Sequence, residues 1–387
     1  MLAFTADRLF ASAATIEHPV MIVEDGKIIE IGPRSSTNIP QQISTLDLLQ
    51  GTIVPGFIDL HIHGGNGYDF MDRQLPSGLS AIEDLLARHG VTGYCPTTVT
   101  APLDVTLRAL ERLANAIDSP GGAKRKSPRP CPLGIHLEGP FLSHARRGVH
   151  PADNLLPPTL ALFERFWQAA RGHIRMMTIA PELEGAPEVI AEARRRDICV
   201  SLGHSDADFA AAERGVAAGA RHATHTFNAM RPLGHRDPGI VGVVLTDSRV
   251  SADIIADGIH VAPSIVKLFA NAKGADNTVL ITDATAATGM QNGSYRLGSM
   301  EIQVKDGLCT ADGKLAGSVL SMDQAVRNLA RFADWSLDQA VVAATRNPAR
   351  IAGLANKGVL APGFDADFVV LSPDGHVQRT FVGGIAC

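Results

Sequence analysis

The chain of 387 residues has no run of about 18 apolar residues, the shortest length that serves as a membrane-spanning helix. Its N-terminus, MLAFTADRLF, carries acidic and basic residues where a signal peptide needs an apolar core. The five cysteines are scattered and include no CxxC pair, which excludes a disulfide framework and fits a reducing compartment. We therefore predict a soluble, cytoplasmic protein without a membrane partner.

The sequence also has no excess of positive charge. Its formal net charge is −5 at pH 7, which argues against nucleic acid as a partner because proteins that bind nucleic acids are normally basic. One basic stretch, KRKSPRP at Lys124–Pro130, follows SPGGA and is typical of a solvated loop, although an anion could bind there. Hydrophobic residues make up 45% and charged residues 19%, so the chain can bury a sizeable core.

Both ends of the chain have the pattern of short strands and turns. MIVEDGKIIEIG places Asp25 and Gly26 between two β-rich runs, a strong hairpin signal. DADFVVLSPDGHVQRTFVGG repeats the pattern near the C-terminus, with a turn at residues 373–375. We predict that residues 1–53 and 355–387 pair into one small β-sandwich domain.

Residues 54–354 alternate between β-rich apolar runs and stretches with helical spacing of apolar residues. Eight strands that alternate with helices predict an α/β fold, a (β/α)8 TIM-type barrel. A doubly wound open sheet is the alternative, but no GxGxxG follows the first strand. A β-hairpin insertion is expected after the eighth strand, in SYRLGSMEIQVKDGLCTADGKLAGS.

The first predicted barrel strand ends in PGFIDLHIHGG, where two histidines lie one residue apart. Side chains at positions i and i+2 of a strand point to the same face, so His61 and His63 project together, as the ligands of a metal would. Two structural histidines at a strand terminus are the alternative interpretation.

Ionisable residues occur at the ends of later predicted strands as well. Active sites of such barrels are built at the C-terminal ends of the strands, so these side chains should converge. Histidine and carboxylate ligands suit zinc, with iron or manganese possible. The residues are His136 and Glu138 on the third strand, His204 on the fifth, His225 within the sixth, with His222 before it, and Asp283 on the eighth. Supporting rather than ligating roles suit His136 and His222.

This arrangement resembles the amidohydrolase superfamily, and the chain is most similar to its N-acetylglucosamine-6-phosphate deacetylase family. The signatures span residues 55–318: PGFIDLHIHG, GIHLEGPFLS…RRGVH, SLGHSDA, HTFNAM, ADGIHV, TDA and LAGS. The resemblance implies metal-dependent hydrolysis of the acetamide of N-acetyl-D-glucosamine 6-phosphate, which yields glucosamine 6-phosphate and acetate.

The resemblance also implies two metal positions that share a glutamate. Many members of the superfamily use a carboxylated lysine after strand four, but IRMMTIAPEL contains no lysine, and Glu138 stands where this family has its glutamate. One position would consist of His61, His63 and Glu138, and the other of Glu138, His204 and His225. One or two divalent ions are implied, with Zn2+ favoured and Fe2+ or Mn2+ possible.

By the same resemblance, Asp283 would take a proton from water and then give one to the departing nitrogen; a helix cap or a fourth metal ligand is its alternative role. Arg236 and His260 would bind the phosphate, and His150 the sugar or its carbonyl. An arginine of this family can cross the dimer interface, so a homodimer is implied. The residues expected to bind the phosphorylated amino sugar are Val149, His150, Asn228, Ala229, Arg236, His260, Leu315, Ala316 and Gly317.

Several alternatives stay open at this stage. A deaminase or cyclic amidase of the superfamily would have the same metal ligands but no phosphate site. A metal-binding protein without catalytic activity is disfavoured because Asp283 accompanies a complete ligand set. The sequence leaves open the metal, its occupancy, and the choice between the glucosamine and galactosamine epimers.

Overall fold

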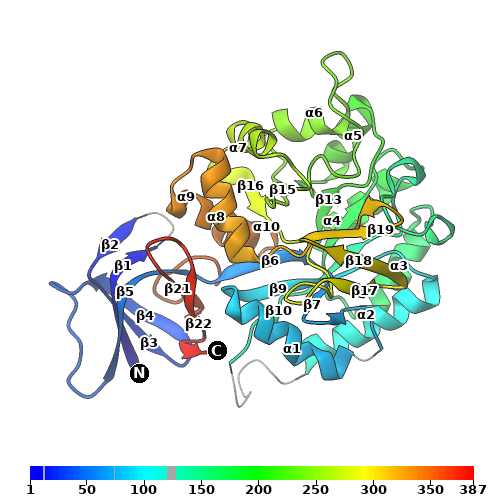
Figure 1. Ribbon diagram of the computed structural model, residues 1–387. Coiled ribbons are helices and arrows are strands. Elements are labelled where there is room, and N and C mark those ends of the chain that lie inside the picture. Colours follow the sequence, from blue (N-terminus) through cyan, green and yellow to red (C-terminus); the bar gives the residue numbers. More distant parts are fainter. Residues whose placement is uncertain (12–13, 74, 120–127) are drawn as a thin grey trace.

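The structure, a computed structural model, describes residues 1–11, 14–73, 75–119 and 128–387 (Figure 1). Most of the predicted basic loop at 124–130 lies outside the described residues. Within the described part of that stretch, Arg129 is bound to the adjacent helix: its guanidinium donates to the Ser80 carbonyl at 2.7 Å and pairs with Asp84. No helix in the described ranges is long and apolar enough to cross a membrane.

A curled parallel sheet forms the larger part of the molecule. Strands β6, β9, β11, β12, β13 and β14 pair in that order, and β15 pairs with β16. Every residue of β6 and β9 is buried, as expected for parallel strands covered on both faces. The bounds are β6 Phe57–Ile62, β9 Val91–Thr98, β11 Ile135–Glu138, β12 Ile174–Ile179, β13 Cys199–Leu202, β14 His222–Ala223, β15 Ala252–Ile254 and β16 Thr278–Leu280.

Single backbone hydrogen bonds connect the two groups of paired strands to each other. Next to β14, Ala223 N–H donates to the Ser251 carbonyl, which precedes β15, at 3.0 Å. At the other junction, Asp283 N–H donates to the His61 carbonyl at 2.9 Å, so the chain after β16 meets β6. The predicted class of alternating parallel strands and helices is therefore confirmed as a curled α/β sheet.

Helices cover the outer face of this sheet (Figure 1). In α3, the Thr159 hydroxyl caps the N-terminus by accepting from Leu162 N–H at 3.2 Å, and the helix buries Phe163 and Phe166. As its proline predicts, α7 begins at Pro263. The bounds are α1 Leu75–Arg88, α2 Leu103–Asp118, α3 Leu160–Ala169, α4 Ala186–Arg195, α5 Phe209–Ala218, α6 Gly239–Thr246, α7 Pro263–Asn277, α8 Met322–Ala333, α9 Leu337–Ala344 and α10 Arg346–Ile351.

Both chain ends contribute to one mixed eight-stranded sheet in the order β23-β22-β21-β5-β1-β3-β4, with β2 paired to β1. Its centre is held by three aromatic rings from opposite ends of the sequence. The Phe368 ring lies 4.9 Å from that of Phe4 and 4.4 Å from that of Phe381. The bounds are β1 Leu2–Phe10, β2 Thr15–Glu17, β3 Pro19–Glu24, β4 Lys27–Pro33, β5 Ser44–Pro55, β21 Phe368–Leu371, β22 Val377–Val382 and β23 Ile385–Ala386.

A small separate sheet, β17 to β20, follows β16 where the sequence predicts an insertion. It packs a satellite core that includes Leu297 and Ile302 against Met71 and Val99, and so covers one side of the strand ends. The bounds are β17 Gly293–Leu297, β18 Met300–Lys305, β19 Leu308–Ala311 and β20 Lys314–Leu315. Three further short strands are β7 Gly64–Gly65, β8 Tyr68–Asp69 and β10 Cys131–Pro132.

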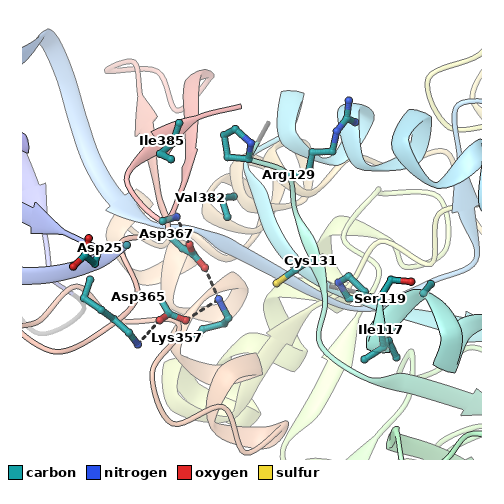
Figure 2. A pocket seen from close by; sticks show the side chains of 16 residues that line it. Asp25, Ile117, Ser119, Arg129, Cys131, Lys357, Asp365, Asp367, Val382 and Ile385 are labelled. Carbon is teal, nitrogen blue, oxygen red and sulfur yellow. Dashed lines mark hydrogen bonds and ion pairs between the residues drawn. The ribbon is translucent and has the colours of Figure 1, made fainter. Parts of the chain in front are cut away.

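An ion cluster lies where the terminal sheet faces the larger part of the molecule, and Figure 2 shows it at the edge of a cavity. The Lys357 ammonium pairs with Asp365 at 2.9 Å and with Asp367 at 2.5 Å. Burial would lower the pKa of Lys357, but the charges of the two aspartates raise it above its usual value. Lys357 therefore compensates two carboxylates that the interface removes from water.

Replacing this lysine should destabilise the chain. Lys357→Met leaves Asp367 without its cation, so we expect the free energy of unfolding to fall by about 3 kcal/mol, as for a buried pair that loses one member. Urea denaturation measures the change. Lys267→Met is the matched control because Lys267 and its partner Asp334 are exposed. Equal losses for the two variants would contradict a stabilising role of the cluster.

Candidate metal centre and its cavity

Two histidines from β6 converge on Glu138 at the end of β11. His61 Nε2 lies 3.3 Å from His63 Nε2 and 3.5 Å from Glu138 Oε1, and His63 Nε2 lies 3.3 Å from Glu138 Oε2. All three side chains are buried. They form a first group of potential metal ligands.

A second group uses the same carboxylate. His204 Nε2 lies 3.2 Å and His225 Nε2 3.1 Å from Glu138 Oε1, and the two nitrogens are 3.1 Å apart. The position of His204 just after β13 agrees with its predicted place at the strand end. The prediction that His225 lies within the sixth strand is wrong: β14 ends at Ala223, and His225 follows it.

The donor set fits a divalent transition metal. Two ligands that each lie about 2.0–2.1 Å from a tetrahedral zinc ion are about 3.3 Å apart, which is the spacing of the atoms here. His63 Nδ1 donates to the Thr97 carbonyl at 3.3 Å and His204 Nδ1 to the Arg146 carbonyl at 3.0 Å. These bonds leave both Nε2 lone pairs directed at the centre, the arrangement typical of histidine ligands.

The histidines around Glu138 favour its ionised carboxylate. Burial would raise the pKa of Glu138, but the charge of His61 and hydrogen bonds from His150, His204 and His225 hold it well below its usual range. Burial lowers the pKa of His204 to about 4, whereas Glu138 outweighs burial at His225 and raises its pKa to about 9. A metal that binds here must displace the proton of His225.

Asp283 reaches the first ligand group from the chain segment after β16. Its Oδ1 lies 3.5 Å from His61 Nε2 and 3.1 Å from His63 Nε2. Burial would raise the pKa of this carboxyl, but the two histidines lower it to about 2. Asp283 is therefore ionised at neutral pH beside the first ligand group.

The backbone turns sharply where these residues leave their strands. His204, His225 and Asp283 have φ values of 48°, 29° and 50°, in a region that costs a non-glycine residue about 1–3 kcal/mol. Hydrogen bonds hold the turn at His225: its N–H donates to the Asp253 carboxylate on β15, which also accepts from His222 Nε2 at 2.9 Å. Asp253 thus fixes the direction of a ligand without touching the centre.

This contact gives a testable prediction. Asp253→Asn retains the size of the side chain but replaces one carboxylate oxygen by a donor, so either His225 N–H or His222 loses its acceptor. We expect the affinity for metal to fall about 10–100-fold, as for other partners that orient a ligand. Competition with a chelator measures the change, with Asp276→Asn on the surface as the control. Unchanged affinity would show that Asp253 does not orient His225.

His136 and His222, for which the sequence predicts supporting roles, are bound to other partners. His136 Nδ1 donates to the Leu60 carbonyl at 3.0 Å, and its Nε2 lies 2.8 Å from the Thr178 hydroxyl. Burial and the neighbouring His61 lower the pKa of His136 well below its usual value, so its ring is neutral.

A cavity of about 170 Å³ opens above the two ligand groups. It brings together most of the residues predicted to bind substrate. Three residues that line it, Val99, Gly148 and Leu297, were not predicted. The predicted site residues that line it are His63, Glu138, Val149, His150, His204, His225, Asn228, Ala229, His260, Asp283, Leu315 and Gly317.

Three predicted residues do not line the cavity. His61 lies fully buried among the ligands, and the Ala316 side chain is buried in the satellite core. Arg236 is exposed, and its Nε donates to His235 Nε2 at 3.1 Å. Arg236 was expected to bind substrate, but it does not line the cavity of its own chain.

The polar residues around the cavity are held by specific partners. Thr100 N–H donates to His150 Nδ1 at 3.2 Å, so the proton of the neutral ring is on Nε2, which lies 3.6 Å from Glu138. His260 Nδ1 donates to Asp257 at 2.7 Å. Asn228 Nδ2 is buried without a partner among the described residues, as expected of a donor that serves a ligand.

The geometry and the sequence agree on a family. A model of the amidohydrolase family matches residues 52–386, and the chain belongs to this family.

The relatives are more specific. N-acetylglucosamine-6-phosphate deacetylase of Bos taurus is 41% identical over 348 residues, which cover 86% of this chain and 82% of the bovine protein. N-acetylgalactosamine-6-phosphate deacetylase of Escherichia coli O157:H7 is 36% identical over 381 residues, which cover 98% of this chain and 97% of that protein. The solved structure of a mutant N-acetyl-D-glucosamine-6-phosphate deacetylase from Mycobacterium smegmatis, in complex with N-acetyl-D-glucosamine-6-phosphate, is also similar. It has a TM-score of 0.92 and 34% sequence identity, and the match covers 100% of this chain and 98% of that chain.

Proposed function

We propose that this chain is a metal-dependent hydrolase that converts N-acetyl-D-glucosamine 6-phosphate into glucosamine 6-phosphate and acetate. The observation that carries the proposal is the pair of buried ligand groups that share Glu138, with the ionised Asp283 beside them at the floor of one cavity. The similarity to deacetylases of phosphorylated amino sugars over most of the chain supports the substrate class.

The metal would be held by His61, His63 and Glu138 in one position and by Glu138, His204 and His225 in the other. We propose Zn2+, for which nitrogen and carboxylate ligands are suited, in one or both positions. A bound divalent metal lowers the pKa of water towards ~7 and polarises an amide carbonyl.

The side chains around the metal would move protons and orient the acetamide. Asp283, ionised at neutral pH, would accept a proton from the attacking water and deliver it to the nitrogen of the departing amine. This delivery matters because an unprotonated amide nitrogen is a poor leaving group. His150 would donate from Nε2–H to the acetamide carbonyl, a role supported by its Thr100 hydrogen bond.

The opposite side of the cavity would bind the sugar phosphate. Donors for it would come from Asn228 Nδ2, which has no partner among the described residues, from the backbone around Ala229 and from the ring of His260. Val149 and the segment Leu315–Gly317, with Ala316 acting through its backbone, would line the sugar. Arg236, exposed on its own chain, would reach the phosphate in the cavity of a partner subunit, so we propose a homodimer.

Arg236→Ala tests the phosphate contact. Charge-assisted hydrogen bonds contribute roughly 1.5–3 kcal/mol each, so kcat/KM for the phosphorylated sugar should fall at least about tenfold. Activity on unphosphorylated N-acetylglucosamine should scarcely change. An equal effect on both substrates would mean that Arg236 has only a structural role.

Subunit mixing tests whether Arg236 acts across the interface. A dimer of one Arg236→Ala subunit and one Asp283→Asn subunit has one cavity with Asp283 and a partner's intact arginine. Mixed and re-associated variants should therefore regain activity that neither has alone. Absence of recovery in verified mixed dimers would assign Arg236 to its own chain or to no site.

The decisive experiment is acetate release from a panel of N-acetylhexosamine 6-phosphates, with metal content measured on the same sample. Preference for the galactosamine epimer would favour the second function, to which the relative from Escherichia coli O157:H7 points. Activity that ignores the phosphate would favour a general amidase or deaminase. No hydrolysis by the metal-loaded protein would favour a non-catalytic metal-binding protein.

We also propose how the chain is divided into domains. We infer that the curled sheet is a (β/α)8 barrel of residues 54–354 and that residues 1–53 and 355–387 form a small β-sandwich domain. The hydrogen bond from Asp283 to His61 supports closure of the barrel, and the aromatic contacts of Phe4 support the joining of the chain ends. The cytoplasmic location stays a prediction.

A further inference from the structure

A second cavity, of about 350 Å³, is lined by an unusual number of arginines. Arg73 precedes α1, Arg108 and Arg112 lie on α2, and Arg296 lies on β17 of the inserted sheet. Two carboxylates, Asp69 and Asp72, also line it, so four guanidinium groups face two acidic groups. The volume is within the range of pockets that bind small molecules. We call this space the arginine cavity.

Arg112 carries the clearest sign of a missing partner. One of its terminal nitrogens donates to the Met71 carbonyl at 2.8 Å, but its Nε is buried with no hydrogen-bond partner among the described residues. Burial, followed by the charges of Arg108 and Arg73, lowers the pKa of Arg112. Like charges held together around a buried donor are unfavourable unless an anion compensates them.

Asp69, one of the two carboxylates that line the arginine cavity, is held by backbone donors. Both oxygens of Asp69 accept backbone hydrogen bonds, from Met71 at 2.7 Å and from Gly298 at 2.9 Å. The cross-strand neighbour of Arg296 is Glu301, whose Oε1 accepts from Ser294 at 3.0 Å and from Gln303. Of the four arginines, Arg108 alone has an ion pair with a carboxylate in the described structure, with Asp104 at 2.5 Å.

We propose that the arginine cavity is a second binding site, distinct from the catalytic cavity, for a phosphate or phosphomonoester dianion. Guanidinium groups bind phosphate through paired N–H donors and remain charged at every physiological pH. Arg112 contributes the buried Nε, and Arg73 and Arg296, which are exposed, line the same cavity from two different segments. The inference is independent of the substrate proposed above.

The two cavities share a wall. Val99 and Leu297 line the catalytic cavity, whereas Met71 and Gly298 line the arginine cavity. Val99 N–H approaches Met71 Sδ at 3.1 Å, and Leu297, the last residue of β17, is followed by Gly298 in the turn to β18. An anion that links Arg296 on β17 to Arg112 on α2 therefore tethers this turn, and it should alter KM for the substrate.

The binding test compares two double variants, each of which removes two positive charges. In Arg112→Gln/Arg296→Gln the arginine cavity loses two donors, whereas Arg165→Gln/Arg331→Gln removes two arginines that do not line it. Inorganic phosphate and glucose 6-phosphate are titrated calorimetrically into each protein at constant ionic strength. We expect the parent and the control to bind one more equivalent of anion than the cavity variant, in which this binding event is weakened at least about tenfold. Tighter binding of glucose 6-phosphate than of phosphate would identify a phosphomonoester as the ligand.

A second variant separates the two sites. His260→Gln should weaken the anion that binds in the catalytic cavity and leave the arginine cavity unaffected. The proposal is overturned if the parent binds only one equivalent, and that one is lost in His260→Gln. It is also overturned if the cavity variant binds anions like the parent but associates less, which would mean that a partner subunit's carboxylate faces the arginines.

Discussion

Asp283→Asn should abolish most of the turnover while the protein keeps its metal and its substrate affinity. The amide has nearly the same shape as the carboxylate and can still contact His63, but it cannot accept a proton from water and return it to the leaving nitrogen. Proton transfer by a positioned side chain typically contributes about 10²–10⁴-fold to the rate, so kcat should fall by a factor in that range. In the parent, His61 and His63 lower the pKa of Asp283 to about 2 despite its burial, which keeps it ionised as a base.

Single-turnover kinetics, with the metal content measured in parallel, distinguishes proton transfer by Asp283 from a role of Asp283 as a metal ligand. If Asp283 moves the proton, the asparagine variant binds metal and substrate like the parent but is slow in the chemical step. Asp276→Asn, a substitution on an exposed ion pair, controls for the loss of an acidic group. Turnover within a few-fold of the parent would mean that another residue acts as acid and base, and a loss of metal would make Asp283 primarily a ligand.

Local chemistry explains which parts of the fold were predictable. Asp25 and Gly26 specify a hairpin turn because both adopt positive φ, 48° and 78°, which aspartate and glycine tolerate. The prediction for the sixth strand was less accurate because HATHTFN looks uniformly suited to a strand. The backbone leaves the extended region at His225 and Phe227, with φ of 29° and 79°, so only His222–Ala223 form β14. That departure depends on the tertiary hydrogen bond to Asp253.

The candidate site was predictable where its residues follow consecutive strands. Parallel strands end at one edge, so His61, Glu138 and His204 could be expected to meet, and the structure brings them together. Val99 and Leu297 were missed because their sequences carry no polar signal; Val99 directly follows β9, and Leu297 reaches the cavity from the inserted sheet.

Other residues depend on three-dimensional neighbours that a sequence pattern does not specify. Asp253 looks like one more aspartate in an apolar run until its contacts with the backbone of His225 and the ring of His222 are visible. The arginines of the second cavity come from segments as distant as Arg73 and Arg296. Spacing arguments on one helix identify Arg108 and Arg112 only as ordinary surface residues.

Glu138 is the residue on which the whole centre depends. Both of its oxygens approach histidine nitrogens from the two ligand groups, at 3.1–3.5 Å. Glu138→Gln keeps the volume but removes the negative charge that attracts the cations, and its amide nitrogen carries hydrogens where a ligand needs a lone pair. The variant thus loses a ligand from both positions at once, an effect that no single histidine substitution can reproduce.

We therefore expect Glu138→Gln to lose both metal and activity. Partners that merely orient a ligand already change metal affinity about 10–100-fold, so loss of the shared ligand should exceed about 100-fold. Elemental analysis and chelator competition measure this, with Glu164→Gln, an exposed glutamate paired with Arg196, as the control. Metal-stripped parent protein should have the same activity defect and recover when metal is added back, whereas Glu138→Gln should recover only at much higher metal concentration. Full metal content together with full activity in Glu138→Gln would refute the shared-carboxylate centre, because the remaining histidines alone would then suffice to hold the metal.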